Sequence, residues 1–198
     1  MKSILPEALE DRIEIFGGVY RLRTSVWRVM QATDALQDDE LLPEHRAELA
    51  AWHLFRWPRP PRRQLSEAVD RALKFLTPES PYRSPKGKRA LDIRQDAAML
   101  CAAFRQQYGI SLPEEALRLD WREFLALLGG ITNETRMGEI MSIRVRELPK
   151  RTAHNGEVIR ELQRLKAIYA LRPGRGGHTF ENGLLKMVEI LAAMAETK

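Results

Sequence analysis

The chain has 198 residues, of which 44% are hydrophobic and 30% charged, a composition typical of a soluble globular protein with one sizeable core or two small ones. It lacks an apolar run of the roughly 20 residues that a membrane-spanning helix needs, and its acidic start is unlike a signal peptide. The net charge is +5, and the only cysteine, Cys101, excludes an internal disulfide, as is typical of a reducing, cytoplasmic compartment.

Residues 13–22 predict a β-hairpin. Two short β-prone runs flank Gly17 and Gly18, and glycine readily adopts the positive φ that both centres of a tight two-residue turn require. A turn at these glycines implies three cross-strand pairs: Ile15 with Tyr20, Ile13 with Leu22, and Glu14 with Arg21. An isolated hairpin is only marginally stable in water, so we expect this one to lie against helices.

Three helices are predicted after the hairpin. The first follows a cap at Thr24 or Ser25, the second has Pro43 in its first turn and runs to about Trp57, and the third follows a cap at Ser66. Apolar residues recur at helical spacing in the first and third helices: Val26, Val29, Met30 and Thr33, then Val69, Ala72, Leu73 and Leu76.

The end of the second predicted helix is apolar nearly all round. Such an end is either clamped between other elements or forms a surface for a partner. We take three of its aromatic residues as candidate partner-binding residues: Trp52, Phe55 and Trp57.

Proline and glycine mark the divisions of the chain. Three prolines exclude regular structure from residues 57–64, and residues 77–89 combine Pro, Ser, Gly and Lys without periodicity, as a linker does. We therefore expect four parts: a hairpin with helices at 1–76, a basic linker at 77–89, a central helical unit at 90–171, and a C-terminal extension at 172–198.

The central unit predicts three consecutive helices that pack on one another. The first ends at Gly109, the second starts near Asp120 and ends at Gly129, and the third follows a cap at Thr132 or Asn133. Their apolar stripes are Ala97, Leu100, Cys101, Phe104 and Tyr108; Trp121, Phe124, Leu125 and Leu128; and Met137, Ile140, Met141 and Val145.

Two further helices are expected towards the C-terminus, separated by a glycine-rich hinge at 173–177. The first has its stripe at Val158, Leu162, Leu165 and Tyr169. The last, at about 181–196, has a short seam with coiled-coil spacing, which we take as a candidate partner-binding or self-association surface: Leu184, Met187, Leu191 and Met194.

An ordered set of residues between 91 and 144 resembles one family. The set is Leu91 and Asp92 with Asp96, AAF at 102–104, QQYGISL at 106–112, DWREF at 120–124 with Leu127 and Leu128, Glu139 and Ile140, and Ile143 and Arg144. It resembles the gene-product-fifteen family of tailed bacteriophages, encoded beside the tape-measure gene, over roughly residues 10–170. The family usually has two tryptophans where this chain reads Asp120-Trp121, which puts the packing at position 120 in question.

The resemblance implies a tail assembly chaperone that holds the tape-measure protein while the tail tube is built around it. Its place would be the cytoplasm of the infected or lysogenic bacterial host. Relatives generally stop before residues 172–198, so the resemblance implies nothing about that extension.

No residue pattern predicts catalysis, a cofactor or a metal. The four histidines are far apart in sequence and lack metal-ligand spacing, and Cys101 lies in an apolar stripe without a histidine nearby. Asp92 and Asp96 could share a helix face as paired carboxylates, but a capping role for Asp92 is favoured. The glycines at 174–177 lack the Lys that follows them in a phosphate-binding loop.

Positive charge is concentrated in two blocks. Residues 59–89 hold nine Lys and Arg against three Asp and Glu, and residues 144–175 hold the same numbers. The run RWPRPPRR interleaves one tryptophan with arginines, a combination able to stack bases and hold phosphates. No nucleic-acid-binding motif accompanies it, so a solvated surface or connector is the favoured interpretation.

The sequence therefore predicts a mainly α protein: a bundle-like helical core, a small N-terminal hairpin and a hinged C-terminal helix. We expect a non-catalytic tail assembly chaperone whose partners are the tape-measure protein or other tail proteins. Self-association into a homo-oligomer is a further expectation. A structural component of the virion tail and a basic nucleic-acid-binding adaptor are the alternatives. No membrane partner is expected.

Overall fold

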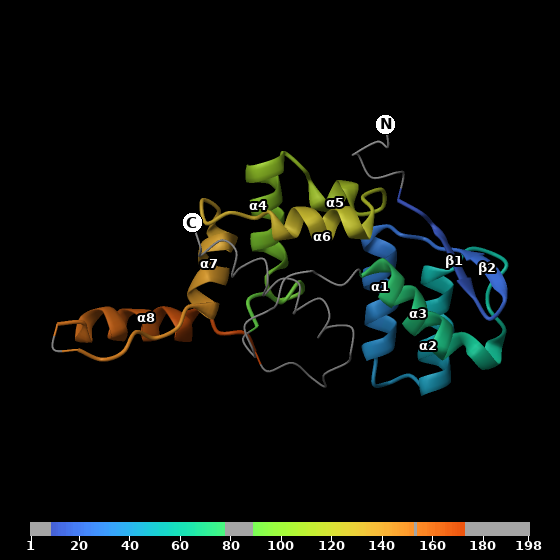
Figure 1. The fold of residues 1–198 in the computed structure, drawn as a ribbon, viewed down its shortest axis with the longest axis horizontal. Helices are drawn as coiled ribbons and strands as arrows, with labels where there is room; N and C mark the ends of the chain where they lie inside the picture. The colour runs from blue at the N-terminus through green and yellow to red at the C-terminus, as the bar shows by residue number, and fades with distance from the viewer. Residues whose placement is uncertain (1–8, 78–88, 153, 173–198) are drawn as a thin grey trace. The chain divides into compact units, whose positions relative to one another are not determined.

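The computed structural model describes residues 9–77, 89–152 and 154–172, and these form a mainly α-helical protein with one small hairpin, as predicted (Figure 1). They divide into two compact units. Unit 1 lies within Met1–Pro78 and Ala116–Phe124, and unit 2 within Glu79–Glu115 and Leu125–Lys198. The predicted hinge and the seam helix with Leu184, Met187, Leu191 and Met194 lie outside the described residues, as does most of the predicted linker.

The hairpin of unit 1 consists of β1 (Arg12–Ile15) and β2 (Gly18–Arg21), but the predicted register is wrong. The turn is formed by Phe16 and Gly17, which both have positive φ, and not by the two glycines. The observed pairs are Arg12 with Arg21, Ile13 with Tyr20, Glu14 with Val19, and Ile15 with Gly18. Because the shift is two residues, Ile13 and Ile15 still share one face, and both are buried.

Three helices make up the bundle of unit 1: α1 (Val26–Gln37), α2 (Pro43–Leu54) and α3 (Leu65–Leu76). Figure 1 shows α2 beside both α1 and α3. The predicted stripe of α3 is confirmed, since Val69, Ala72, Leu73 and Leu76 are all buried. Ser66 lies inside α3 and does not cap it, because a short 3-10 turn, η1 (Arg62–Gln64), leads directly into the helix.

Helix α2 ends at Leu54, three residues earlier than predicted. Phe55 turns to extended backbone, with φ −99° and ψ 139°, and forms a β-bridge with Leu22. The N–H of Arg56 donates to the carbonyl of Arg21 over 2.8 Å. The chain after α2 is therefore fixed against the end of the hairpin and cannot continue as a helix.

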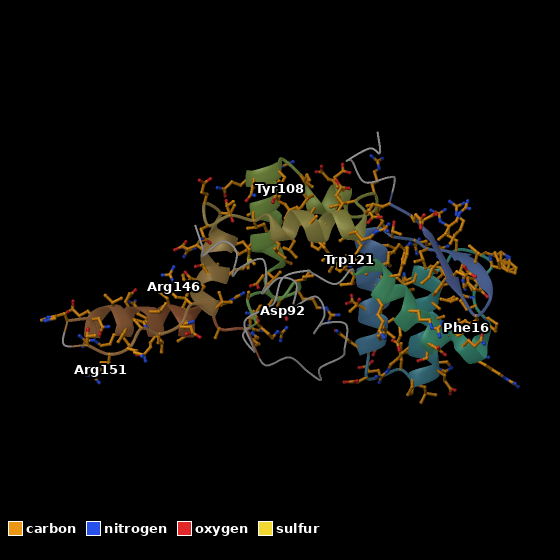
Figure 2. All side chains as sticks on the ribbon, in the orientation of Figure 1. Phe16, Asp92, Tyr108, Trp121, Arg146 and Arg151 are labelled. Carbon is orange, nitrogen blue, oxygen red and sulfur yellow. The ribbon has the colours of Figure 1, made fainter. Side chains whose placement is uncertain are left out.

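Residues 116–124 belong to unit 1, although the predicted division assigns them to the central unit. The N–H groups of Val26 and Trp27 donate to the carbonyls of Leu119 and Ala116, both over 2.9 Å. These bonds satisfy amides that the first turn of a helix leaves free, which accounts for the absence of a side-chain cap at Ser25. Trp121, labelled in Figure 2, is 1% exposed and stacks on Phe124.

Unit 2 contains α4 (Ala97–Tyr108), the short α5 (Leu112–Glu115), α7 (Arg136–Val145) and α8 (Gly156–Ile168). Helix α6 (Trp121–Gly129) begins in unit 1 and ends in unit 2. Gly109 ends α4 with φ +70°, as predicted. The hydroxyl of Tyr108 donates to the carbonyl of Leu127 over 2.7 Å, which joins the ends of α4 and α6.

Three details of unit 2 differ from the prediction. Ala97 is exposed, because α4 buries the face of Leu100, Ala103 and Phe104. The cap of α7 is Thr135, whose hydroxyl accepts the N–H of Gly138, and neither Thr132 nor Asn133 caps it. Helix α8 buries only Leu162 of its predicted stripe.

Candidate interaction surface

A cluster of aromatic and cationic side chains covers the end of α2 in unit 1. We call it the Arg–Trp cluster, and it consists of Arg23, Trp27, Arg28, Trp52 and His53. Trp27 comes from the first turn of α1 and Trp52 from the last turn of α2; they are 37% and 44% exposed. Large aromatic side chains exposed to this extent are candidates for contact with a partner.

Two arginines lie over the tryptophan rings of the cluster. The guanidinium carbon of Arg28 is 4.8 Å from the ring centre of Trp27 and 5.3 Å from that of Trp52. Arg23 also lies by Trp52, at 5.9 Å, and donates from Nη1 to the backbone carbonyl of Trp52 over 2.6 Å. Cation–π contacts of this kind hold the exposed rings in place.

His53 is the buried member of the cluster and packs edge-on against both tryptophans. Its ring centre is 4.9 Å from that of Trp52 and 5.8 Å from that of Trp27. The side chain is buried, and its Nδ1 has no hydrogen-bond partner among the described residues. Burial and then the positive charges of Arg28 and Arg23 lower the pKa of His53 below its ordinary value, opposed in part by Asp34.

The cluster is positively charged beyond its own two arginines. Burial and then the neighbouring charges of Arg28, Arg59 and Arg56 lower the pKa of Arg23. An assembly of cations this close to exposed aromatic rings favours a partner that is both apolar and acidic.

The three partner-binding residues predicted at the end of α2 lie in different environments: two are exposed and one is buried. Trp52 belongs to the cluster, and Trp57, just beyond the helix, is 80% exposed. Phe55 is fully buried and packs edge-on against Tyr20 at 6.1 Å between ring centres, so it belongs to the core of unit 1 and is removed from the candidate set. Sequence reasoning missed Trp27, Arg23 and Arg28.

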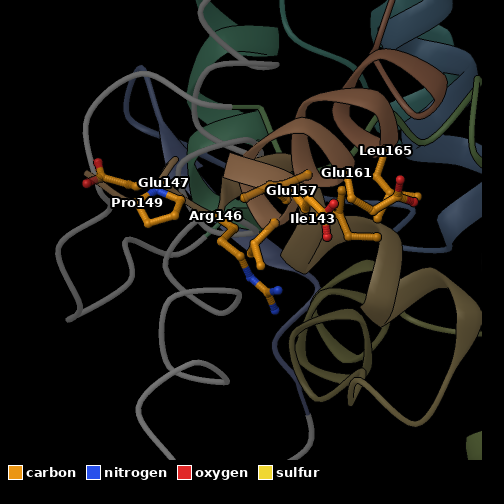
Figure 3. Close-up of a pocket in the computed structure, with 9 residues that line it drawn as sticks. Ile143, Arg146, Glu147, Pro149, Glu157, Glu161 and Leu165 are labelled. Atoms are coloured by element: carbon orange, nitrogen blue, oxygen red, sulfur yellow. The ribbon is translucent and has the colours of Figure 1, made fainter. Parts of the chain in front are cut away.

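A second candidate lies in unit 2, where α7 and α8 form a groove of about 600 Å³ (Figure 3). Its apolar lining includes Ile143 of α7 with Leu162 and Leu165 of α8. Glu157 and Glu161 of α8 also line it. Neither the periodicity nor the resemblance indicated this groove.

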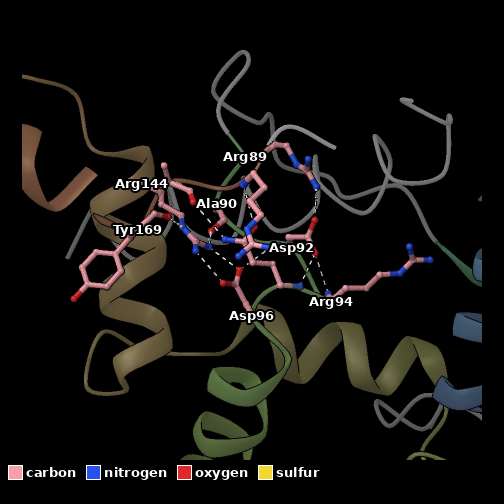
Figure 4. Close-up of polar contacts among 10 residues, drawn as sticks. Arg89, Ala90, Asp92, Arg94, Asp96, Arg144 and Tyr169 are labelled. Carbon is pink, nitrogen blue, oxygen red and sulfur yellow. Dashed lines mark hydrogen bonds and ion pairs between the residues drawn. The ribbon is translucent and has the colours of Figure 1, made fainter. Parts of the chain in front are cut away.

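The paired carboxylates of Asp92 and Asp96 form part of a structural cluster (Figure 4). Asp96 is buried and accepts two bonds from Arg144, at 2.6 and 2.9 Å. Asp92 was predicted to cap the helix; it accepts the backbone N–H groups of Arg94 and Gln95 and so caps the turn before α4, not α4 itself. Because each carboxylate already has its own donors, this pair suits a structural role better than acid–base chemistry.

Two observations concern metals and membranes. Among the residues that the structure describes, no three His, Cys, Asp or Glu side chains are grouped closely enough to hold a metal ion. Within 9–77, 89–152 and 154–172, no helix has both the length and the apolar character needed to cross a bilayer.

Comparison with known proteins identifies the class. Residues 5–171 match the model of the family described as "Bacteriophage Gp15 protein". The chain belongs to this family, and it is therefore a phage-associated protein. No curated protein and no solved structure matches it.

The electrostatics of His53 give a prediction for unit 1. An unfolded histidine binds a proton near pH 6.5, whereas folded His53 does so only at a lower pH. The contribution of neutral His53 to the free energy of unfolding is therefore fully present above about pH 6.5. It is lost as the pH falls through the lowered pKa. The lowered pKa values of Asp11 and Asp120 act in a separate window, below about pH 4.

We expect His53→Phe to reduce the loss of stability between pH 6.5 and pH 5, because phenylalanine stays neutral and keeps the ring packing. The measurement is urea unfolding followed by tryptophan fluorescence, which reports unit 1 alone because all four tryptophans belong to it. His45→Phe is the control, since His45 is exposed on the same helix. Equal pH dependence in the two variants would contradict a buried neutral His53.

Proposed function

We propose that this protein is a non-catalytic tail assembly chaperone that binds the tape-measure protein in the cytoplasm of the phage-infected or lysogenic host. Membership of the phage family supports a role in the phage life cycle. The observation that carries the proposal is the Arg–Trp cluster, in which exposed tryptophan rings lie against arginines, with a further exposed tryptophan, Trp57, five positions after Trp52.

The chemistry of this surface suits a long helical client. Tryptophan and arginine are the residues most enriched where interfaces concentrate their binding energy. An amphipathic helix would place apolar side chains on Trp52 and Trp57 and acidic side chains beside Arg23 and Arg28. Because the arginines are partly exposed, the attraction should weaken with salt, which suits a client that must be released when the tube encloses it.

The first test is co-expression with the tape-measure protein encoded beside this gene. We expect the tape-measure protein to remain soluble, and to be recovered in a complex, only when this chain is present. Equal solubility of the tape-measure protein without this chain, and no complex on affinity purification, would remove the proposal.

The second test locates the surface. We expect Trp52→Ala combined with Trp57→Ala to reduce recovery of the complex at least tenfold, which corresponds to about 1.4 kcal/mol or more of lost binding. Leu42→Ala is the matched control, because Leu42 is an exposed apolar residue at the opposite end of α2. Circular dichroism should show that both variants keep their helix content.

Nucleic acid is a second candidate ligand, because Trp57 is exposed between Arg56 and Arg59 and could stack on a base. The guanidinium of Arg28 lies close to the rings of both Trp27 and Trp52, which leaves those rings less suited to stacking. Titration with mixed-sequence single-stranded DNA at low salt decides between them: quenching of tryptophan fluorescence would support an adaptor, and unchanged fluorescence excludes it.

A further inference from the structure

Helix α8 belongs to unit 2, and much of its apolar surface is left exposed by the residues that the structure describes. Of its 13 residues only Leu162 is buried, Leu165 is half-buried, and Val158 is 63% exposed. These three residues are spaced by four and then three positions, so they form one stripe along the helix. A lone helix of this length is marginal in water, and its stability comes mainly from burial of such a stripe.

The groove between α7 and α8 continues this stripe. All three residues of the stripe line it, together with Ile143 of α7 (Figure 3). Five of the nine residues that line the groove come from α8, between Glu157 and Leu165. A second helix laid along α8 would therefore cover both the stripe and the groove.

The charges on α8 indicate which helix fits. Its first half holds Glu157 and Glu161 with Arg160 between them, a net charge of −1, and its second half holds the cations Arg164 and Lys166, a net charge of +2. The ammonium of Lys166 donates to the backbone carbonyls of Ile143 and Arg144 over 2.8 and 2.7 Å, so Arg164 is the more exposed cation of the second half. The ion pair between Arg164 and Glu161 is 3.7 Å long with both side chains largely exposed, so it holds neither group strongly. In an antiparallel pair of identical helices, the half of each with net negative charge would lie level with the half of the other with net positive charge.

We propose that the α7–α8 groove receives helix α8 of a second copy of this chain, in an antiparallel contact with two-fold symmetry. Such a contact is self-complementary, as a two-fold interface must be: the stripe around Leu162 meets itself, and halves of opposite net charge come level. Antiparallel alignment also places the helix dipoles favourably. The helices are short, so the dimer is weak and concentration-dependent, below the size of a standard interface.

The apolar stripe is tested by sedimentation equilibrium of the full chain. We expect a monomer–dimer equilibrium in the micromolar range, and Val158→Asp should weaken it at least tenfold. Leu117→Asp is the control, because it places the same charge on an exposed apolar residue of unit 1. A wild-type chain that stays monomeric at 200 μM, or an unchanged equilibrium in Val158→Asp, overturns the proposal. So does loss of the dimer in Leu191→Asp alone, which would assign self-association to the predicted C-terminal seam.

The charges are tested by exchange between two variants. Glu157→Lys with Glu161→Lys makes α8 wholly cationic, and Arg160→Glu with Arg164→Glu makes it mainly acidic. We expect each variant alone to be monomeric, because like charges repel, and an equimolar mixture to form a heterodimer. A control with the same change in net charge, Glu114→Lys with Glu134→Lys, should dimerise as the wild type does. A mixture that stays monomeric contradicts the contact, and a partner protein in the groove could not produce the rescue.

Discussion

Asp96→Ala is expected to lower the free energy of unfolding by about 3–5 kcal/mol, because it leaves the buried guanidinium of Arg144 without its counter-charge. Both side chains are 6% exposed, so water cannot replace the lost carboxylate. Arg144 also donates to the backbone carbonyls of Ala90 and Tyr169, at 2.9 and 2.6 Å. The guanidinium is therefore bonded to three segments of unit 2, and it cannot turn outward without breaking those hydrogen bonds.

The carboxylate of Asp96 has a second task that alanine also removes. Its Oδ2 accepts the backbone N–H of Asp92 over 2.9 Å, which closes the turn leading into α4. Urea unfolding followed by far-UV circular dichroism gives the change in free energy. Glu139→Ala is the matched control, since it breaks an Arg–Glu pair on α7 that is half exposed and worth at most about 1 kcal/mol.

A double-mutant cycle separates the pair from its surroundings. Asp96→Ala combined with Arg144→Met should be less destabilising than the sum of the two single changes, because it removes the orphaned charge along with its partner. The double variant should still have a lower free energy of unfolding than the wild type, because the carbonyls of Ala90 and Tyr169 lose their donor. Additive single changes would mean that the ion pair is not formed in solution.

The hairpin shows what a local pattern can and cannot determine. Alternation along 13–22 was sufficient to predict two strands and their buried face, because that face depends only on every second residue. The turn position was not predictable from the two glycines. Gly18 is needed for a different reason: a Cβ there would lie 3.1 Å from the ring of Tyr20, so the glycine makes room for that ring while Phe16 and Gly17 form the turn.

The division into units could not be predicted, because a single helical stripe crosses the boundary between them. Trp121, Phe124, Leu125 and Leu128 were predicted to be buried on one helix, and all four are. Periodicity shows which face of a helix is apolar but not what covers it. The decisive bonds join α1 to residues 116–119, some 90 positions away, and no local signal marks such backbone pairing.

The candidate surfaces were predictable only where aromatic residues crowd together in sequence. Trp52 and Trp57 stood out in this way. Trp27 and Arg28 lie on the face of α1 that its stripe assigns to solvent, and they become notable only because α2 brings Trp52 beside them. Asp96 and Arg144 both belong to the residues that carry the family resemblance, yet their pairing across 48 positions appears only in the fold.

Gly138→Ala is expected to destabilise unit 2 by about 3 kcal/mol or more, because an added methyl would overlap main-chain atoms and disturb a helix cap. A Cβ at this position would lie 2.1 Å from the carbonyl oxygen of Thr132, 2.6 Å from its carbonyl carbon and 3.1 Å from the nitrogen of Asn133. Main-chain atoms cannot rotate aside as the end of a long side chain can, so the turn itself must move.

That turn is bonded to the start of α7. The carbonyl of Thr132 accepts the hydroxyl of Thr135 over 2.9 Å, and the same hydroxyl oxygen accepts the N–H of Gly138 over 3.1 Å. Moving Thr132 therefore separates the cap from the helix it stabilises. Gly156→Ala is the matched control, because a Cβ at that position has no atom within 4 Å; it should be neutral or stabilising by up to about 1 kcal/mol.

The comparison of the two alanine variants distinguishes two starts for α7. If the helix began at Thr132 or Asn133, as its sequence suggests, Gly138 would be an ordinary interior position and alanine there would stabilise it by about 1 kcal/mol. With the cap at Thr135, the same substitution is expected to destabilise the protein instead. Urea unfolding followed by far-UV circular dichroism measures both variants. A Gly138→Ala chain as stable as Gly156→Ala would show that the turn at Thr132 does not pack against the first turn of α7.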